Sequence, residues 1–271
     1  MISRTCVVDG LRLHILHHRA GRVGILLIHG NSSCKEIFSK QLHDLKTTDL
    51  GIVVPDLPGH GASDDSNRPS TTYSFPGYAK ILGGLMRKVG YSSFHVLGWS
   101  LGGHIGIEML ACNSSVRSLL ISGTPPVRLT PQGVAEGFHW TGATALAGRK
   151  YLRAEDVRRY TTAMMGAPIG HDHHLARMAR RTDGNARYWM VANGMAGRGV
   201  DEVEAVARDD RPIAVIQGSA DPFVRIGHFD RIRFGNLWKG RPILIETGHA
   251  AHWQRPRAFN EAMMEFVMQG H

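Results

Sequence analysis

The segment Gly98-Trp99-Ser100-Leu101-Gly102-Gly103 has the form G-x-S-x-G. An apolar run over 94–97 precedes it, and a helical pattern over 101–112 follows it. These features predict a strand, a tight turn with Ser100 at its apex, and a helix. Glycine suits positions 98 and 102, because a Cβ atom there would collide with the neighbouring chain in so tight a turn. The turn would hold the Ser100 hydroxyl at a helix N-terminus, where the helix dipole favours developing negative charge.

The motif alone is weak evidence, because the chain contains 32 glycines and a serine between glycines also suits an ordinary turn. Support comes from apolar, β-branched runs that alternate with helical patterns. Strands are expected over 24–28, 51–54, 94–97, 118–122, 213–217 and 242–245, with helices such as 75–89 and 257–268. This alternation predicts an α/β fold with a mostly parallel sheet covered by helices on both faces. The loops that follow the strands then meet at one edge of the sheet.

The stretch 124–210 interrupts the alternation, because its pattern is helical and contains no convincing strand. Candidate helices lie over 130–148, 154–165, 174–182 and 185–196. We expect this stretch to form a helical cap (lid) over a core made of residues 1–123 and 211–271. Frequent glycines in the stretch suit the joints of a lid, although they also suit plain turns between short helices.

The composition is that of an ordinary globular protein, with 271 residues, 42% hydrophobic and 20% charged. The longest apolar runs reach only about half of the roughly 20 residues that a membrane span needs. The first 20 residues lack the apolar core of a signal peptide. We therefore expect a cytoplasmic protein that does not engage a membrane.

The net charge of +9 would permit nucleic-acid binding. The arginines are scattered, however, and no basic stripe is interleaved with aromatic residues, so we expect no nucleic-acid partner. The three cysteines are Cys6, Cys34 and Cys112, an odd number without metal-binding spacing, which fits a reducing compartment. Cys34 follows His29-Gly30 closely enough to lie near the site, but a small buried thiol is its simpler role.

A serine hydroxyl is a weak nucleophile until a base takes its proton, and histidine is the side chain suited to this near neutral pH. His249 follows the last expected strand and should lie at the same sheet edge as Ser100. His252 is a close alternative, but we expect it further along, in the next helix or loop.

The base needs an acid that fixes its tautomer. Asp221 follows the strand 213–217, although Asp before proline also suits a simple turn. The other possible position, after the strand 118–122, holds Gly-Thr-Pro-Pro and no carboxylate. Asp209 and Asp210 precede a strand and should lie at the opposite edge, so Asp221 is the expected acid.

The oxyanion of an acyl-transfer reaction needs two hydrogen-bond donors. One is expected to be the backbone N–H of Leu101, directly after the nucleophile. The other should come from the loop after the strand 24–28, where we favour Asn31, through its backbone N–H or its side-chain amide. Ser32 is the alternative, and Asn31 also suits a plain turn.

Other chemistries have less support. The chain lacks the G-x-x-x-x-G-K-[ST] pattern of a phosphate loop. The segment His171-Asp172-His173-His174 looks like a metal cluster, but adjacent residues on a helix do not face one ligand, and Asp172 suits a helix N-cap. We expect no metal and no cofactor.

Taken in order, His29-Gly30, the segment Asp56-Leu-Pro-Gly-His-Gly61, the serine turn, Asp221 and Gly248-His249 resemble the α/β-hydrolase superfamily over essentially the whole chain. A narrower resemblance lies in 98–109, 123–127, 29–33 and 234–238. These segments are similar to the quorum-quenching N-acyl-homoserine lactonases of this fold, which open the lactone ring of bacterial signals without a metal.

The resemblance implies Ser100 as nucleophile, His249 as base, Asp221 as acid, and Asn31 with Leu101 as the oxyanion hole. A known member has Glu where this chain has Asp221, but Asp is common in the wider fold. Tyr160 matches a cap tyrosine thought to touch substrate, and Trp99 and Trp140 are also expected at the substrate.

The implied function is a serine hydrolase that opens the lactone ring of N-acyl-homoserine lactones, with a small ester or lactone as its substrate; the oligomeric state is left open. A general carboxylesterase or lactonase for other small esters is the alternative. A C–C bond hydrolase, an amidase for the same signals or a hydrolase-fold ligand receptor remain open. An epoxide hydrolase or dehalogenase is disfavoured, because those enzymes place Asp where this chain has Ser100.

Overall fold

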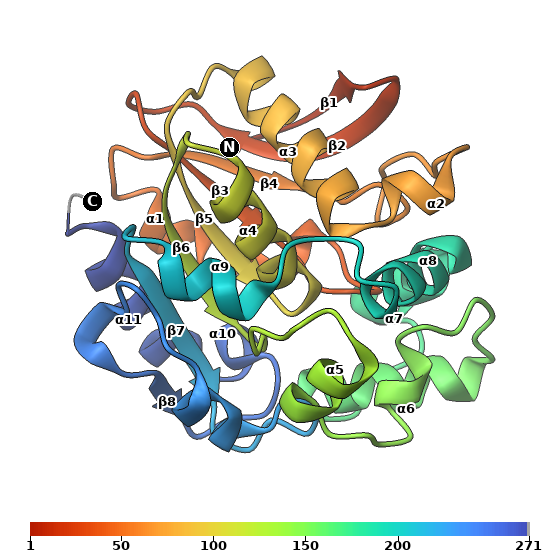
Figure 1. The fold of residues 1–271 in the computed structure, drawn as a ribbon. Coiled ribbons are helices and arrows are strands. Elements are labelled where there is room, and N and C mark those ends of the chain that lie inside the picture. Colours follow the sequence, from red (N-terminus) through yellow and green to blue (C-terminus); the bar gives the residue numbers. More distant parts are fainter. Residues whose placement is uncertain (270–271) are drawn as a thin grey trace.

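A computed structural model describes residues 1–269, and eight strands in it form one sheet in the order β1-β2-β4-β3-β5-β6-β7-β8 (Figure 1). All neighbouring pairs from β4 through β8 are parallel, whereas β2 is antiparallel to both β1 and β4. The mostly parallel sheet expected from the sequence is therefore confirmed. The strands are β1 (Ile2–Val8), β2 (Leu11–His18), β3 (Gly24–Ile28), β4 (Gly51–Pro55), β5 (Phe94–Trp99), β6 (Val116–Ser122), β7 (Ile213–Gly218) and β8 (Ile243–Ile245).

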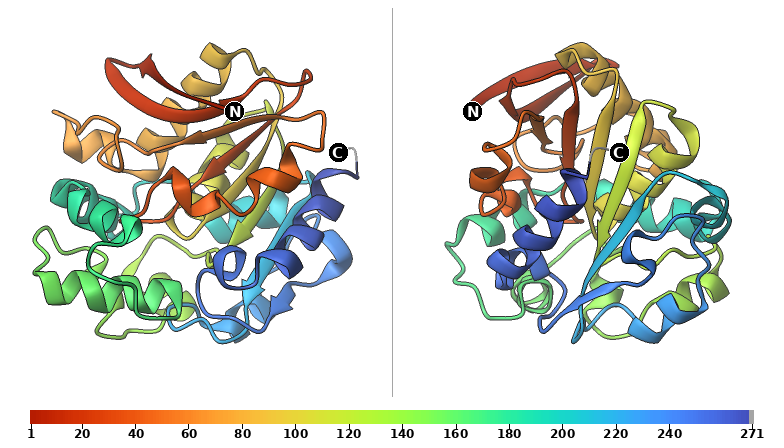
Figure 2. Two further views of the ribbon diagram at one scale, coloured as in Figure 1. Left: turned by 180° about the vertical axis from the view of Figure 1, so that it is seen from behind. Right: turned by 90° about the vertical axis from the view of Figure 1, so that its left-hand side faces the viewer.

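Helices cover both faces of the sheet. In Figure 1, α3, α4 and α9 lie in front of it, and the reverse view in Figure 2 shows α1 and α11 on the other face. The helices are α1 (Leu42–Leu45), α2 (Pro69–Thr72), α3 (Phe75–Val89), α4 (Leu101–Cys112), α5 (Pro131–Gly137), α6 (Ala154–Met165), α7 (His174–Arg181), α8 (Gly184–Met195), α9 (Glu202–Arg208), α10 (Ala251–Gln254) and α11 (Pro256–Val267), with short 3-10 helices η1 (Lys35–Phe38), η2 (Thr144–Leu146), η3 (Ile226–Arg231) and η4 (Trp238–Gly240).

The central strands are apolar on both sides because both faces of the sheet are covered. Every residue of β3, β4 and β5 is buried. Helix α3 has the bounds that its sequence predicts. The Ser74 hydroxyl accepts a hydrogen bond from the N–H of Gly77 at its start, and Gly90, with φ 99°, ends it in the left-handed conformation.

The hairpin β1–β2 is an element that we did not predict. Its turn, Asp9-Gly10, has positive φ at both residues, 50° and 81°, as a two-residue hairpin turn requires. In β2 the buried positions alternate, with Leu13 and Ile15 fully buried. The Asp-Gly pair and this alternation are the sequence signals that point to the hairpin.

Between β6 and β7 the described chain forms helices and no strand, so its helical character is confirmed. We call residues 124–210 the inserted segment. The expected helix 130–148 is wrong beyond Gly137, because Phe138 turns away to form a β-bridge with Val224. The last helix of the inserted segment, α9, packs against α4 and so helps to cover one face of the sheet.

None of the helices among residues 1–269 is both long enough and apolar enough to cross a membrane.

Candidate active site

Ser100 stands at the tight turn between β5 and α4, with φ 56° and ψ −121°. A positive φ is strained for a residue with a side chain. A Cβ atom on Gly98 would lie 2.2 Å from the carbonyl oxygen of Gly102, and one on Gly102 would lie 2.0 Å from that of Ile28. Both positions therefore require glycine, which is the steric reason for the motif.

The neighbouring strand holds this turn in place. The N–H of Ser100 donates to the carbonyl oxygen of Ser122 at 2.8 Å. The hydroxyl of Thr124 donates to the carbonyl oxygen of Ser100, also at 2.8 Å. The residues at the end of β6 and just after it therefore hold the strained backbone of Ser100 from one side.

The structure brings Asp221 and His249 together. Oδ2 of Asp221 lies 2.8 Å from Nδ1 of His249, and both side chains are buried. The same oxygen accepts a hydrogen bond from the Gln217 amide at 2.8 Å. Oδ1 accepts from the backbone N–H of Phe223 at 2.8 Å and that of Val224 at 3.2 Å. Three donors besides His249 therefore hold the carboxylate in its orientation toward the imidazole.

The environment of Asp221 keeps it ionised. Burial alone would raise the pKa of its carboxyl group. The neighbouring His249 and the hydrogen bonds from Phe223 and Gln217 outweigh burial, so the pKa lies below its ordinary value. An ionised carboxylate accepts a hydrogen bond from a protonated Nδ1 of His249. In that tautomer Nε2 carries no proton and can act as a base.

Trp99 contacts His249 through a hydrogen bond and through its ring. Its indole Nε1 donates to the backbone carbonyl of His249 at 3.0 Å, and the two rings are 5.4 Å apart between centroids. The Trp99 side chain is fully buried and is not among the described residues that line the cavity. The structure therefore places Trp99 away from the cavity where it was expected, with its indole hydrogen-bonded to the backbone of His249.

His252, the alternative base, lies in the core. It is fully buried, and its ring packs 5.0 Å from that of Trp99 and 5.2 Å from that of Phe38. Neither ring nitrogen has a hydrogen-bond partner among residues 1–269. Burial, with the nearby His249 and Lys40, lowers its pKa to about 3. A neutral histidine enclosed in this way does not face Ser100 as a base.

Asn31 lies in the loop after β3 and connects it to the inserted segment. Its side-chain Nδ2 donates to the carbonyl oxygen of Ala147 at 2.8 Å and to the hydroxyl of Tyr160 at 3.4 Å. Leu101 is the first residue of α4, where a backbone N–H has no partner within the helix. Ser32, the alternative donor, has φ 55°, and its hydroxyl donates to the Asn31 side-chain oxygen.

These residues share one cavity of about 380 Å³. Ser100, His249, Asn31, Leu101 and Tyr160 all line it, so the loops of the sheet edge and the inserted segment meet there. Most of the remaining lining is apolar. It includes Phe75, Val127, Phe138, Trp140, Met190 and Gly194.

The tryptophan predicted at the substrate, Trp140, is one of these lining residues and is 69% exposed. It therefore stands where the cavity meets solvent. Tyr160 is buried, and burial raises the pKa of its hydroxyl to about 12, so it keeps its proton at neutral pH.

One polar pair in the cavity wall was not foreseen. His104 lines the cavity, stacks on Phe75 and places Nδ1 2.8 Å from Glu202 Oε1. Glu202 also accepts a hydrogen bond from the N–H of Val127 at 2.9 Å. His104 follows Ser100 by one helical turn, which is a sequence signal for the same face of α4. Glu202 carries no such signal, because only the packing of α9 brings it there.

The chain matches known hydrolases in sequence and in structure. A model of the alpha/beta hydrolase family matches residues 25–262. The structure of N-acyl homoserine lactonase AidH complexed with N-butanoyl homoserine is 35% identical, with a TM-score of 0.94 over 100% of this chain and 99% of that chain. A mutant of AidH complexed with N-hexanoyl homoserine lactone is also 35% identical, with a TM-score of 0.93 over 98% of this chain and 97% of that chain.

Relatives with assigned activities are more distant in sequence. A 2-succinyl-6-hydroxy-2,4-cyclohexadiene-1-carboxylate synthase of Pectobacterium atrosepticum is 26% identical over 90% of this chain and 93% of its own length. A 2-hydroxy-6-oxononadienedioate/2-hydroxy-6-oxononatrienedioate hydrolase of Klebsiella pneumoniae is 23% identical over 95% of this chain and 91% of its own length. The relatives therefore share an architecture but differ in substrate.

Proposed function

This chain belongs to the alpha/beta hydrolase family, and on that premise we propose that it is a serine hydrolase that opens N-acyl-homoserine lactones. The observation that carries the proposal is the apolar cavity onto which Ser100 and His249 both open. An N-acyl chain is apolar and needs such a cavity, whereas the lactone ring needs the polar groups beside it. The 35% identity to a lactonase over almost the whole chain supports the same substrate class.

In the proposed reaction, Ser100 Oγ attacks the lactone carbonyl carbon while Nε2 of His249 takes its proton. As the ring C–O bond breaks, His249 returns that proton to the departing ring oxygen, which becomes the homoserine hydroxyl. The former lactone carbonyl is now bonded to Ser100 Oγ as an ester, the acyl-enzyme. A water molecule then attacks the ester carbonyl carbon while Nε2 of His249 takes a proton from that water. As the ester bond breaks, His249 passes this proton to the departing Ser100 Oγ. The product is an N-acyl-homoserine carboxylate.

Asp221 stabilises the imidazolium that forms in each half of the reaction. Its short contact with Nδ1 of His249 holds the tautomer in which Nε2 is the base. The buried position of the pair strengthens this interaction, because little water screens it.

The proposed oxyanion hole consists of the backbone N–H groups of Leu101 and Asn31. The side-chain amide of Asn31 already donates to Ala147 and Tyr160, which leaves its backbone N–H for the oxyanion. The N-terminus of α4 adds the favourable end of the helix dipole beside Leu101.

The inserted segment is proposed to act as a cap that selects the substrate. Tyr160 accepts a hydrogen bond from Asn31, so its own hydroxyl proton can be donated to the amide carbonyl of the N-acyl group. The acyl chain would lie among the apolar side chains of α5 and α8. Trp140 would cover the chain where the cavity opens.

One observation argues against the substrates named for the more distant relatives. The names of those relatives describe a carboxylate and a dioate, which call for positively charged partners. No Lys or Arg side chain within residues 1–269 lines the cavity. A neutral, apolar ester or lactone fits this lining better.

The test is turnover by the purified protein on homoserine lactones with short, medium and long acyl chains, beside a panel of simple carboxylic esters. We expect ring opening, followed by recovery of the lactone when the product is acidified. A cleaved amide does not recover on acidification, so that result would point to an amidase. Preference for simple esters over every lactone would favour the general carboxylesterase, and binding without turnover would favour a receptor.

A further inference from the structure

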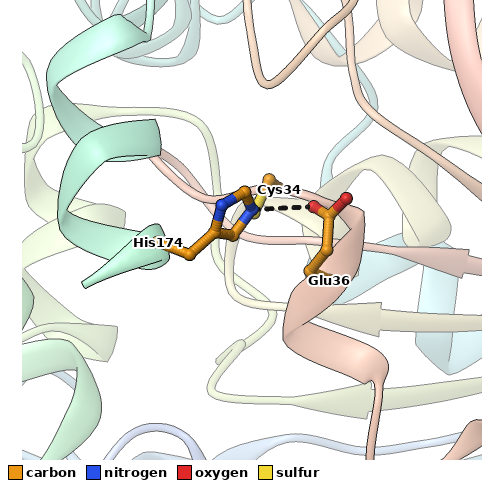
Figure 3. A group of neighbouring side chains, drawn as sticks. All are labelled: Cys34, Glu36 and His174. Carbon is orange, nitrogen blue, oxygen red and sulfur yellow. Dashed lines mark hydrogen bonds and ion pairs between the residues drawn. The ribbon is translucent and has the colours of Figure 1, made fainter. Parts of the chain in front are cut away.

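Three metal-ligating side chains meet outside the proposed active site. Cys34 lies in the loop after β3, Glu36 lies in η1, and His174 is the first residue of α7 (Figure 3). Sγ of Cys34 lies 3.7 Å from Nε2 of His174, and Nε2 of His174 lies 3.3 Å from Oε2 of Glu36. One donor atom from each of the three lies within 4.8 Å of the other two.

The group is partly enclosed. Cys34 is fully buried, whereas the side chains of Glu36 and His174 are 38% and 40% exposed. Lys35 Nζ pairs with Oε1 of Glu36 at 2.8 Å, which leaves Oε2 toward His174. Oε2 is itself buried and has no hydrogen bond of good geometry among the described residues. A soft sulfur, an imidazole nitrogen and a carboxylate oxygen therefore lie close together, between one buried and two partly exposed side chains.

We propose that Cys34, Glu36 and His174 bind one Zn²⁺ ion, with water as the fourth ligand. Zinc takes thiolate, imidazole and carboxylate ligands with bonds of about 2.0–2.3 Å, so neighbouring ligand atoms of a tetrahedral site lie roughly 3.3–3.6 Å apart. The two separations at His174, 3.7 Å and 3.3 Å, are within about 0.1 Å of this range. On binding, the Cys34 thiol releases its proton to solvent and becomes the thiolate ligand.

This site is separate from the proposed chemistry, because none of its three residues lines the cavity. It instead joins two parts of the chain. Cys34 and Glu36 belong to the core, three and five residues after Asn31, while His174 belongs to the inserted segment. The ion would fasten α7 to the loop that carries Asn31. It therefore acts as a structural clamp and not as a Lewis acid for substrate.

The residues of the segment His171-Asp172-His173-His174 do not form one metal site together. His171 pairs with its neighbour Asp172 at 3.2 Å, and the ring of His173 caps α7 by accepting from the N–H of Leu175. Only His174 faces Cys34 and Glu36. Sequence order hides the site, because 140 residues separate Cys34 from His174.

The experiment uses full-length protein without a histidine tag, freed of metal by chelation and then titrated with Co²⁺ and Zn²⁺. Co²⁺ is a spectroscopic substitute that gives a thiolate charge-transfer band in the near ultraviolet when cysteine is a ligand. We expect one ion per chain, the band with Co²⁺, its loss on addition of Zn²⁺, and a higher melting temperature with Zn²⁺, because the ion binds only the folded chain.

Matched variants locate the site. Cys34→Ser should abolish the band, and His174→Ala should weaken Zn²⁺ binding at least about tenfold. His171→Ala, a histidine three positions away with an exposed side chain, should bind as the wild type does. Cys112→Ser removes the exposed cysteine and should keep the band.

Three outcomes would overturn the proposal. They are an absence of stoichiometric binding by the wild type, equal weakening by His171→Ala and His174→Ala, and loss of the band in Cys112→Ser with its retention in Cys34→Ser. The melting temperature without metal shows whether each variant is folded. The test does not measure lactone turnover, so a failure of the zinc proposal is distinguishable from a failure of the proposed function.

Discussion

The side-chain amide of Asn31 donates a hydrogen bond to the hydroxyl oxygen of Tyr160 at 3.4 Å. One partner lies in the loop after β3 and the other lies in α6 of the inserted segment. Through this contact the loop proposed to bind the oxyanion is coupled to the residue proposed to bind the acyl amide. It also leaves the Tyr160 hydroxyl with a proton to donate into the cavity.

Tyr160→Phe removes that donor and keeps the aromatic ring against Phe223, whose centroid lies 6.2 Å away. We expect KM for an N-acyl-homoserine lactone to rise about tenfold, in line with the loss of one hydrogen bond of roughly 1.4 kcal/mol, while kcat changes less. Steady-state kinetics on an N-acylated lactone and on a lactone without the amide measure this. If both substrates lose equally, Tyr160 does not recognise the amide.

Ser100→Ala removes the proposed nucleophile. Turnover should fall by at least about 10³-fold, because neither His249 nor the oxyanion donors can form the acyl-enzyme alone. Alanine can adopt the backbone of Ser100 no worse than serine, so the melting temperature should stay near that of the wild type. Substantial residual turnover on a lactone would show that Ser100 is not the nucleophile.

Asp221→Asn tests the tautomer of His249. The asparagine oxygen would keep the two hydrogen bonds from the N–H groups of Phe223 and Val224 and give up the single one from Gln217, which turns its NH₂ group toward His249. Nδ1 of His249 must then accept, and Nε2 carries the proton and cannot act as a base. We expect kcat to fall about 10⁴-fold with little change in KM. NMR of the imidazole nitrogens reports the tautomer directly, and an unchanged tautomer would contradict this account.

Gly194→Leu tests the acyl-chain part of the cavity. Gly194 lines it on α8, and a Cβ atom there would meet only the Phe75 ring, at an ordinary 3.8 Å. A leucine side chain would therefore extend into space proposed for the acyl chain. We expect kcat/KM to fall about tenfold or more for long-chain lactones and little for the shortest. Gly194→Ala is the matched control, and uniform loss across chain lengths would argue against this placement.

His252→Phe tests the buried neutral histidine. The folded-state pKa of about 3 lies below the ordinary value of about 6.5. As pH falls below 6.5, the unfolded chain gains a proton that the folded chain does not take up, so stability is lost progressively toward pH 3. Between pH 8 and pH 5, His252 should account for about 2 kcal/mol of lost unfolding free energy.

The variant should lose about 2 kcal/mol less than the wild type over this pH range, measured by urea unfolding. Phenylalanine suits the site, because Phe38, Trp99 and Phe259 already surround the ring. His171→Phe, at an exposed position, should follow the wild type. Identical pH profiles for wild type and His252→Phe would mean that folding does not lower the pKa of His252.

The site was predictable where it depends on strand ends. Ser100, Asp221 and His249 each follow a strongly apolar run, and parallel strands bring such positions to one edge whatever the loops do. Gly98 and Gly102 were predictable because so tight a turn leaves no room for a Cβ atom at either position. Features that depend on how the inserted segment packs against the core were not predictable from the sequence. Helix α5 stops at Gly137 because Phe138 pairs with Val224, a tertiary contact that outweighs local helical propensity.

The role of Trp99 was missed for a related reason. Trp99 was expected at the substrate, but it is the last residue of β5 and its side chain is fully buried in the core. Its indole therefore lies beneath His249. A local pattern predicts which element a residue occupies, whereas the partner of its side chain depends on segments far away in the sequence.

The carboxylate of Glu202 gives the inserted segment an evolutionary property. It accepts the N–H of Val127, near the point where the segment leaves the core, and it lies near the point where the chain returns. The start of the segment is therefore held beside the helix that ends it, and an ion pair between Arg128 and Asp201 lies next to this contact. On the proposed function, mutation can reshape the helices between them, and with them the range of substrates, while the two ends and Ser100 keep their positions. Such a module allows new specificities to arise without a new catalyst.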